Sequence, residues 1–421
     1  MIARAAAGCV EPIAAPRTAT NAGTLPALRT LVGIRGFVER CAGNGLALSG
    51  VRLQSIVIAW LVLEMTGSRM WLGVVVGLPA LAVIGASLAG GVLADSQHAR
   101  ATLRTTRLAM AGAAFVAGLL VSTGQVEIGF LMMVALVAAF ATAVDMPVNR
   151  TLIFDLVGRD RLLSGTAMSS MAQNLCAVFG PLAVGVLMSR AGIDAALYAL
   201  AAAYAVSSLL IPPVERQSPP RDISPWQELK AGIAYLSATP CVAWLVGLLF
   251  LVPLAGVFFA MVPVYAREVL DVGPAGLGAI MAAYGAGTVL GSGYLVINGQ
   301  MRNRGQRVTV VGVLFGLGVI AFAVSDSILV SGLISFAIGV TAMLWLNSVS
   351  AMVQTAAAPE MRGRAMSVGT MGIQLMSAGW LVAGPVSTLA GPLATVVLAG
   401  AAFAALSLLV YARSADVRAI D

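Results

Sequence analysis

Two ionisable residues lie deep inside long apolar segments, where a charge is costly and is usually kept for a function. Arg52 lies about 12 residues into the first such segment, which is about 18 Å along a helix and close to a bilayer midplane. It either faces a central cavity and attracts anionic substrate groups, or pairs with backbone carbonyls as a structural residue. The sequence leaves both interpretations open.

Asp145 is the acid that the sequence places inside hydrocarbon, late in the fourth apolar segment. It lies roughly 27 Å from the outer start of that segment, deeper toward the cytosol than Arg52, so a direct bridge between the two requires a kinked helix. Arg150 and Arg52 are the cations that we consider as its neighbours. Asp145 is a candidate proton carrier, and the alternative is a structural acid that bonds at the inner gate.

Other polar and aromatic side chains inside the apolar segments suit an amphiphilic substrate stacked on aromatic walls. With Arg52, the predicted substrate-binding set consists of Gln54, Trp60, Gln173, Asn174, Asn347 and Gln374. The chain has one histidine, and neither paired carboxylates nor metal-ligand spacings occur. We therefore expect no enzymatic activity, no metal and no cofactor.

The composition is that of a membrane protein, with 59% hydrophobic residues, 10% charged residues and a mean hydropathy of +0.94. A helix needs about 20 apolar residues to cross a bilayer, and twelve segments qualify. They are residues 40–64, 71–94, 104–123, 127–148, 166–189, 194–213, 241–266, 275–297, 308–325, 327–350, 365–389 and 391–412.

The basic residues predict the orientation of these segments. Most of the 25 Lys and Arg residues fall in the two tails and in every second gap. The opposite side holds only Arg69, Arg190 and Arg267, so the positive-inside rule places both termini in the cytosol. This bias explains the basic pI and predicts contact with anionic lipids, and we expect no nucleic-acid partner.

The longest gap, residues 214–240, predicts two halves of six segments each. Its prolines break helices, and Trp226, Leu229, Ile233 and Leu236 then share one face of a short amphipathic helix on the membrane surface. The predicted organisation is a cytosolic tail, a first bundle, a linker, a second bundle and a second tail. Their limits are 1–36, 37–213, 214–240, 241–412 and 413–421.

The turn after the second segment contains a motif, Gly91-Val92-Leu93-Ala94-Asp95, followed by Arg100. It resembles the G-x-L-A-D-R-x-G-R-R/K signature of the major facilitator superfamily. In that family the aspartate caps a helix of the other half and holds the cytosolic side shut. The resemblance implies gating roles for Asp95 and Arg100, and for Arg362 and Arg364 at the start of the eleventh segment.

Three further stretches resemble the enterobactin-exporter-like, macrolide-efflux-like branch of this superfamily. They are residues 143–168, 262–292 and 359–369, the last reading PEMRGRAMSVG. In the first stretch Asn149 occupies the usual arginine position and Arg150, a further gating candidate, follows it. The resemblance implies an all-α membrane protein with twelve transmembrane helices in two six-helix bundles.

The function expected from this resemblance is export of a small amphiphilic organic molecule, such as a drug, siderophore or other secondary metabolite. A proton is the expected counter-ion, and the protein is expected to act as a monomer in the bacterial inner membrane. The alternatives are an uptake carrier or lipid facilitator of the same fold, or a transporter-like sensor or scaffold that moves nothing.

Overall fold

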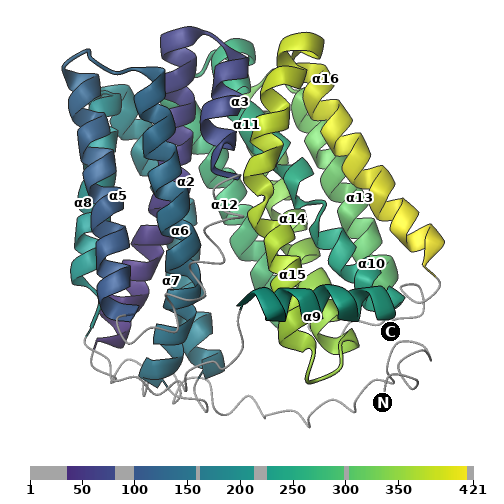
Figure 1. Cartoon of the computed structure of the whole chain (residues 1–421). Coiled ribbons are helices and arrows are strands. Elements are labelled where there is room, and N and C mark those ends of the chain that lie inside the picture. Colours follow the sequence, from purple (N-terminus) through teal and green to yellow (C-terminus); the bar gives the residue numbers. More distant parts are fainter. Residues whose placement is uncertain (1–35, 81–98, 158–161, 213–224, 298–302, 415–421) are drawn as a thin grey trace. The chain divides into compact units, whose positions relative to one another are not determined.

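The computed structural model describes residues 36–80, 99–157, 162–212, 225–297 and 303–414, and the regular elements within these ranges are helices (Figure 1). Nine helical segments of the described chain are long and apolar enough to cross a membrane. A tenth apolar helix, Ile193–Leu209, is shorter. The described residues form two compact units, one with residues 36–61 and 99–212 and the other with residues 62–80 and 226–414.

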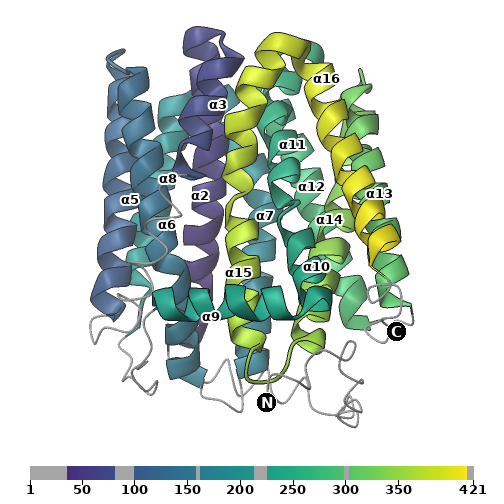
Figure 2. The same cartoon turned by 45° about the vertical axis from the view of Figure 1, so that its right-hand side comes forward.

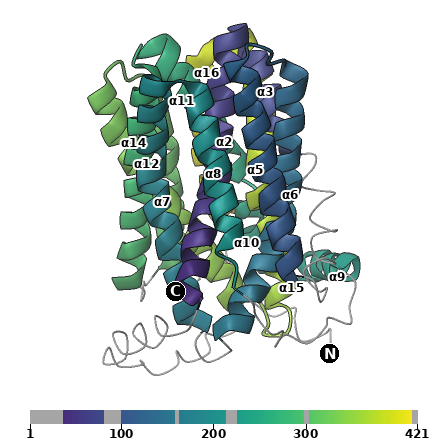
Figure 3. The same cartoon turned by 90° about the vertical axis from the view of Figure 1, so that its left-hand side faces the viewer.

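The first unit contains the greater part of one helix and four further helices. These are α2 (Phe37–Thr66), α5 (Ala99–Ser122), α6 (Ile128–Val157), α7 (Leu162–Ala191) and α8 (Ile193–Leu209). Helix α5 packs against both α6 and α8 (Figure 3). Leu103, Val144, Val148, Leu152 and Ile211 form a buried apolar cluster between these helices.

The second unit contains the end of α2 and the remaining elements. These are α3 (Arg69–Gly77), α9 (Pro225–Ala238), α10 (Pro240–Leu249), α11 (Val252–Val264), η3 (Tyr265–Val269), α12 (Gly273–Ile297), α13 (Arg304–Ala323), α14 (Ile328–Ala356), α15 (Arg362–Gln374) and α16 (Met376–Arg413). Helix α16 packs against α3, α11 and α13, while α12 packs against α14 (Figure 2).

Proline and glycine interrupt the longer predicted segments. The seventh segment divides between α10 and α11, where Pro253 stands at the start of the second helix, and it ends in the π-helical turn η3. Proline causes such breaks because it donates no backbone hydrogen bond. Gly391, with φ 84°, interrupts α16 just before Pro392, and this break separates the predicted eleventh and twelfth segments.

Helix α9 crosses the lower part of α15 in both views (Figures 1 and 2). The Tyr235 hydroxyl accepts a hydrogen bond from the Ala358 backbone N–H at 3.1 Å, which joins α9 to the loop before α15. Ile233 is 54% exposed, and Leu229 and Leu236 are half-buried. The predicted helix is therefore present, with part of its apolar face uncovered.

The faces that the helices turn outward are apolar. Large hydrophobic side chains such as Phe115, Phe179, Leu329 and Leu389 are more than half exposed. Water would oppose this arrangement, whereas lipid tails solvate it at little cost. All twelve predicted segments coincide wholly or in part with described helices, so the prediction of an all-α membrane fold is confirmed; the predicted domain limits stay a prediction.

Candidate coupling and substrate sites

A buried ion pair joins α5 to α6 within the first unit. Arg107 Nε donates to Asp145 Oδ1 at 3.1 Å, and the side chains are 0% and 3% exposed. Arg107 Nη1 also donates to the Ser207 carbonyl of α8 at 3.0 Å. Asp145 Oδ2 and Arg107 Nη2 have no partner within the described chain, so the pair is buried but incompletely satisfied.

The helices bring these two residues together through the apolar cluster around them. Val144 and Val148 flank Asp145 on α6 and pack with Leu103, which lies one turn before Arg107 on α5. Arg100, Arg104 and Arg107 follow a spacing of four and three residues and thus lie along one side of α5. Arg100 is exposed at the helix start and donates to the Ile211 carbonyl at 3.3 Å.

Sequence reasoning did not find Arg107. The sequence predicts Arg150 and Arg52 as neighbours of Asp145, and it places Arg107 near the start of the third apolar segment, 104–123, without a partner. The structure pairs Asp145 with Arg107; Arg52 is exposed, and the side chain of Arg150 lies outside the described part. The regular spacing of Arg100, Arg104 and Arg107 in the sequence indicates the role of Arg107. Three cations on one side of a helix need a polar partner.

A second arginine, Arg40, is buried in the same unit. It is 1% exposed, and its three guanidinium nitrogens have no hydrogen-bond partner among the described residues. Arg40 lies within electrostatic reach of both Arg107 and Asp145. Gly43, one turn along α2, allows a close approach to α8, since a Cβ there would lie 3.2 Å from the Ser207 carbonyl; Arg107 Nη1 would be at an ordinary contact distance of 3.6 Å.

Two side-chain hydrogen bonds tie α2 to its neighbours. Asn44 Nδ2 donates to Ser169 Oγ of α7 at 3.0 Å, and the Tyr204 hydroxyl of α8 donates to Gln54 Oε1 at 2.9 Å. Gln54 is 1% exposed, so this predicted substrate residue lies inside the helix packing, with only its Nε2 without a partner among the described residues. Asn44 and Ser169 were not predicted as site residues.

The remaining predicted substrate residues differ in exposure. Arg52 is exposed on α2, whereas Trp60 is 6% exposed. Gln173 and Asn174 are half-buried neighbours on α7 of the same unit. In the other unit, Asn347 is exposed on α14 and Gln374 is half-buried at the end of α15. The predicted substrate residues are therefore divided between the two units, and each unit contains only part of the set.

The predicted gating residues are only partly described. Asp95 and the side chain of Arg150 lie outside the described part. Arg362 and Arg364 stand in the first turn of α15, where Arg362 Nε donates to the Ala357 carbonyl at 3.2 Å and Arg364 Nη1 donates to Met361 Sδ at 3.3 Å. Both arginines are half-buried.

The second unit contains a polar contact that sequence reasoning missed. Arg69, the first residue of α3, donates from Nε to Glu268 Oε2 of η3 at 3.1 Å and from Nη1 to the Ser387 carbonyl at 3.3 Å. Nearby, α3 and α16 touch through two glycines, because a Cβ on Gly73 would lie 2.6 Å from the Gly384 Cα. Contact this close between helix backbones requires residues without side chains.

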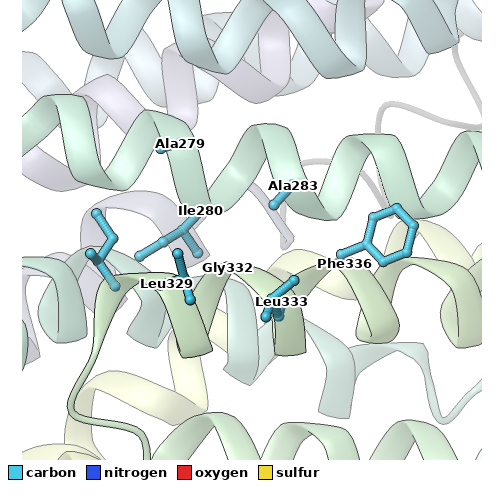
Figure 4. Close-up of a pocket in the computed structure, with 8 residues that line it drawn as sticks. Ala279, Ile280, Ala283, Leu329, Gly332, Leu333 and Phe336 are labelled. Carbon is cyan, nitrogen blue, oxygen red and sulfur yellow. The ribbon is translucent and has the colours of Figure 1, made fainter.

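An apolar groove of about 300 Å³ lies between α12 and α14 (Figure 4). It is lined by Ala279, Ile280, Ala283, Ile328, Leu329, Gly332, Leu333 and Phe336. The side chains of these residues offer no hydrogen bonds, and none belongs to the predicted substrate set. Within the described ranges, no cluster of three His, Cys, Asp or Glu residues has the arrangement of a metal site.

The profile of the Major Facilitator Superfamily matches residues 41–381. The multidrug efflux pump Tap of Mycolicibacterium fortuitum is 27% identical over 387 residues, which cover 87% of this chain and 89% of the pump. The enterobactin exporter EntS of Salmonella typhi is 26% identical over 301 residues, which cover 69% of each chain.

Solved transporter structures share the fold at low sequence identity. A mutant of the peptide transporter POT has a TM-score of 0.72 at 13% identity, and the match covers 92% of this chain and 95% of the transporter. A bacterial homologue of the human lysosomal transporter Spinster has a TM-score of 0.68 at 14% identity, with 90% and 96% covered. These likenesses confirm the predicted transporter fold.

Proposed function

We propose that this chain, which belongs to the Major Facilitator Superfamily and is a multi-pass membrane transporter, exports a small amphiphilic organic molecule in exchange for protons. The observation that carries the proposal is the buried pair of Arg107 and Asp145, because Asp145 is the only acid among the side chains that the structure describes as buried. The direction of transport is inferred from relatives that are a multidrug efflux pump and an enterobactin exporter.

Asp145 is the proposed proton carrier. A proton on Asp145 removes its charge and weakens its bond to Arg107, which keeps its second hydrogen bond to Ser207. An uncompensated charge in a buried site is unfavourable by several kcal/mol, so α5 and α6 then favour an arrangement that hydrates or re-pairs Arg107. Release of the proton restores the pair, and this alternation links protonation to helix movement.

Substrate recognition is assigned to the exposed Arg52 and to the half-buried Gln173 and Asn174 of the first unit. Arg52 supplies a positive charge for anionic substrate groups, and the two amides supply hydrogen bonds. We keep Trp60, Gln54, Asn347 and Gln374 in the proposed set, although the bond to Tyr204 already occupies one end of Gln54. This combination of charge, amides and apolar walls favours amphiphilic molecules.

Two gates are proposed for alternating access. On the cytosolic side, Asp95 would act with Arg100 and Arg150 against the start of α15, where Arg362 and Arg364 stand. On the outer side, Arg69 and Glu268 would hold α3 against η3 and α16 of the same unit, a contact supported by their ion pair and by the close approach of Gly73 to Gly384. We place the protein as a monomer in the bacterial inner membrane with cytosolic termini.

Transport direction is tested in everted and right-side-out vesicles that contain the protein. Under an imposed proton gradient, a fluorescent amphiphilic dye should accumulate in everted vesicles and not in right-side-out vesicles. The reverse result would establish an uptake carrier. If purified protein in liposomes supports neither dye movement nor substrate-dependent proton flux for any compound of a chemically broad panel, the proposal of export fails in favour of a sensor or scaffold.

A further inference from the structure

The charges buried in the first unit do not balance. Arg40 and Arg107 carry two positive charges, while Asp145 is the only acid among the side chains that the structure describes as buried. Arg40 lies within electrostatic reach of both partners of the ion pair. An arginine side chain keeps its proton in proteins, so the group carries one positive charge for which the described residues supply no counter-charge.

The hydrogen-bond donors of this group are also in excess. The guanidinium of Arg40 offers five N–H donors, and its three nitrogens have no partner among the described residues. Arg107 Nη2 is likewise without a partner there, and the group's own unpartnered acceptor is a single oxygen, Asp145 Oδ2. A buried charge without partners is strongly unfavourable, so the site requires an acceptor of negative charge that several N–H groups can surround.

The helices limit the size of such an acceptor. Arg40 is 1% exposed, and Gly43 one turn away lies directly against Arg107 and the Ser207 carbonyl. Residues three apart on a helix are neighbours with Cβ atoms about 5–6 Å apart, so Arg40 leaves α2 one turn from the point where Gly43 meets Arg107. A compact monovalent ion matches both this confinement and the single excess charge.

We propose that Arg40 and Arg107 form a binding site for a small monovalent anion, with chloride as the ion of suitable size and charge. The anion accepts hydrogen bonds from Arg40 and from Arg107 Nη2, while Arg107 keeps its bonds to Asp145 and Ser207. The site is separate from substrate recognition, and it does not depend on the proposed direction of transport or on proton exchange.

The test measures thermal unfolding of the purified full-length protein in detergent without substrate. Sodium chloride or sodium bromide replaces sodium gluconate at constant ionic strength, because gluconate is too large for the site. We expect chloride and bromide to raise Tm saturably, on the order of 2–4 °C. If Tm is the same in chloride as in gluconate, or if it rises with chloride concentration without saturating, the proposal is overturned.

Arg40→Gln separates the site from general salt effects, and Arg307→Gln is the matched control because Arg307 is exposed on α13. The Arg40 variant should lose the saturable response, whereas the control keeps it. Asp145→Asn should tighten chloride binding by about tenfold, since it removes the competing negative charge. Equal responses of the wild type and the Arg40 variant would contradict the assignment.

If the Arg40 variant does not fold, the wild type still decides the question. Crystals grown in bromide should show an anomalous peak beside the Arg40 guanidinium. If bromide peaks are present at other positions of the protein and none lies beside Arg40, the site is rejected. The measurement uses no transported compound. If the transport assay fails while chloride still raises Tm saturably, only the proposed export function is refuted and the anion site stands.

Discussion

Arg107 of α5 and Asp145 of α6 are joined by a hydrogen bond of 3.1 Å at a position where neither side chain has appreciable contact with the surface. A surface ion pair contributes about 0–1 kcal/mol, whereas breaking a buried pair by removing one partner costs about 3–5 kcal/mol. The pair therefore makes the alignment of these two helices sensitive to the charge of a single carboxyl group.

Asp145→Asn should abolish proton-coupled movement of substrate and leave exchange of preloaded substrate intact. The amide cannot exchange a proton, yet it fills the same space beside Arg107. Proton flux and counterflow in liposomes measure the two activities separately. Asp326→Asn, at an exposed acid before α14, is the control, and unchanged proton flux in the Asp145 variant would remove this residue from coupling.

Arg107→Ala should destabilise the protein by about 3–5 kcal/mol, because it leaves Asp145 buried without its cation. Combining it with Asp145→Asn should recover much of this loss, since the double variant buries neither charge. Denaturation of the four proteins forms a double-mutant cycle. Arg104→Ala on the same helix is the control, and additive effects of the two changes would show that the pair contributes no coupling energy.

Arg52→Ala should weaken transport of anionic substrates far more than transport of neutral ones, because the exposed guanidinium attracts negative charge. A loss of about tenfold in apparent affinity, or about 1.4 kcal/mol, is expected for an anionic compound. Competition assays with matched anionic and neutral compounds measure the difference. If both classes lose affinity equally, Arg52 serves the structure of α2 rather than recognition.

Arg69→Glu should weaken the contact between α3 and η3, since it places two acids together at the position of the present ion pair. Only about 0–1 kcal/mol of stability is at stake, because both side chains are about 30% exposed. The larger effect is expected on the population of outward-open protein, which cysteine accessibility from the outer side reports. Adding Glu268→Arg should restore the wild-type accessibility; continued exposure in the double variant would contradict an outer gate.

Several features of the fold followed from the sequence because they depend on local chemistry. A helix in lipid must satisfy its own backbone hydrogen bonds, so apolar segments of sufficient length predict the helices directly. The break between α10 and α11 and the one at Gly391 accompany prolines in the sequence. The depth of Asp145 in the membrane stays a prediction from its distance along an apolar segment.

The partners of the polar residues depended on packing between helices. Arg40 stands in the first turn of α2, and Arg107 stands about two turns into α5, near the start of a predicted apolar segment. A sequence predicts cations at such positions to contact water or lipid headgroups. The structure buries both because α2, α5 and α8 pack closely at Gly43 and Ser207. The register of one helix against another is set by such contacts, and no spacing within a single segment contains it.

The sequence by itself determined that this protein is a helical membrane transporter, since hydropathy, charge bias and family motifs are properties of single segments. Only the tertiary structure decided which charges meet: Asp145 with Arg107, Arg69 with Glu268, and Arg40 with no described partner. The physical reason is that burial and ion pairing arise between segments that lie tens or hundreds of residues apart in the chain.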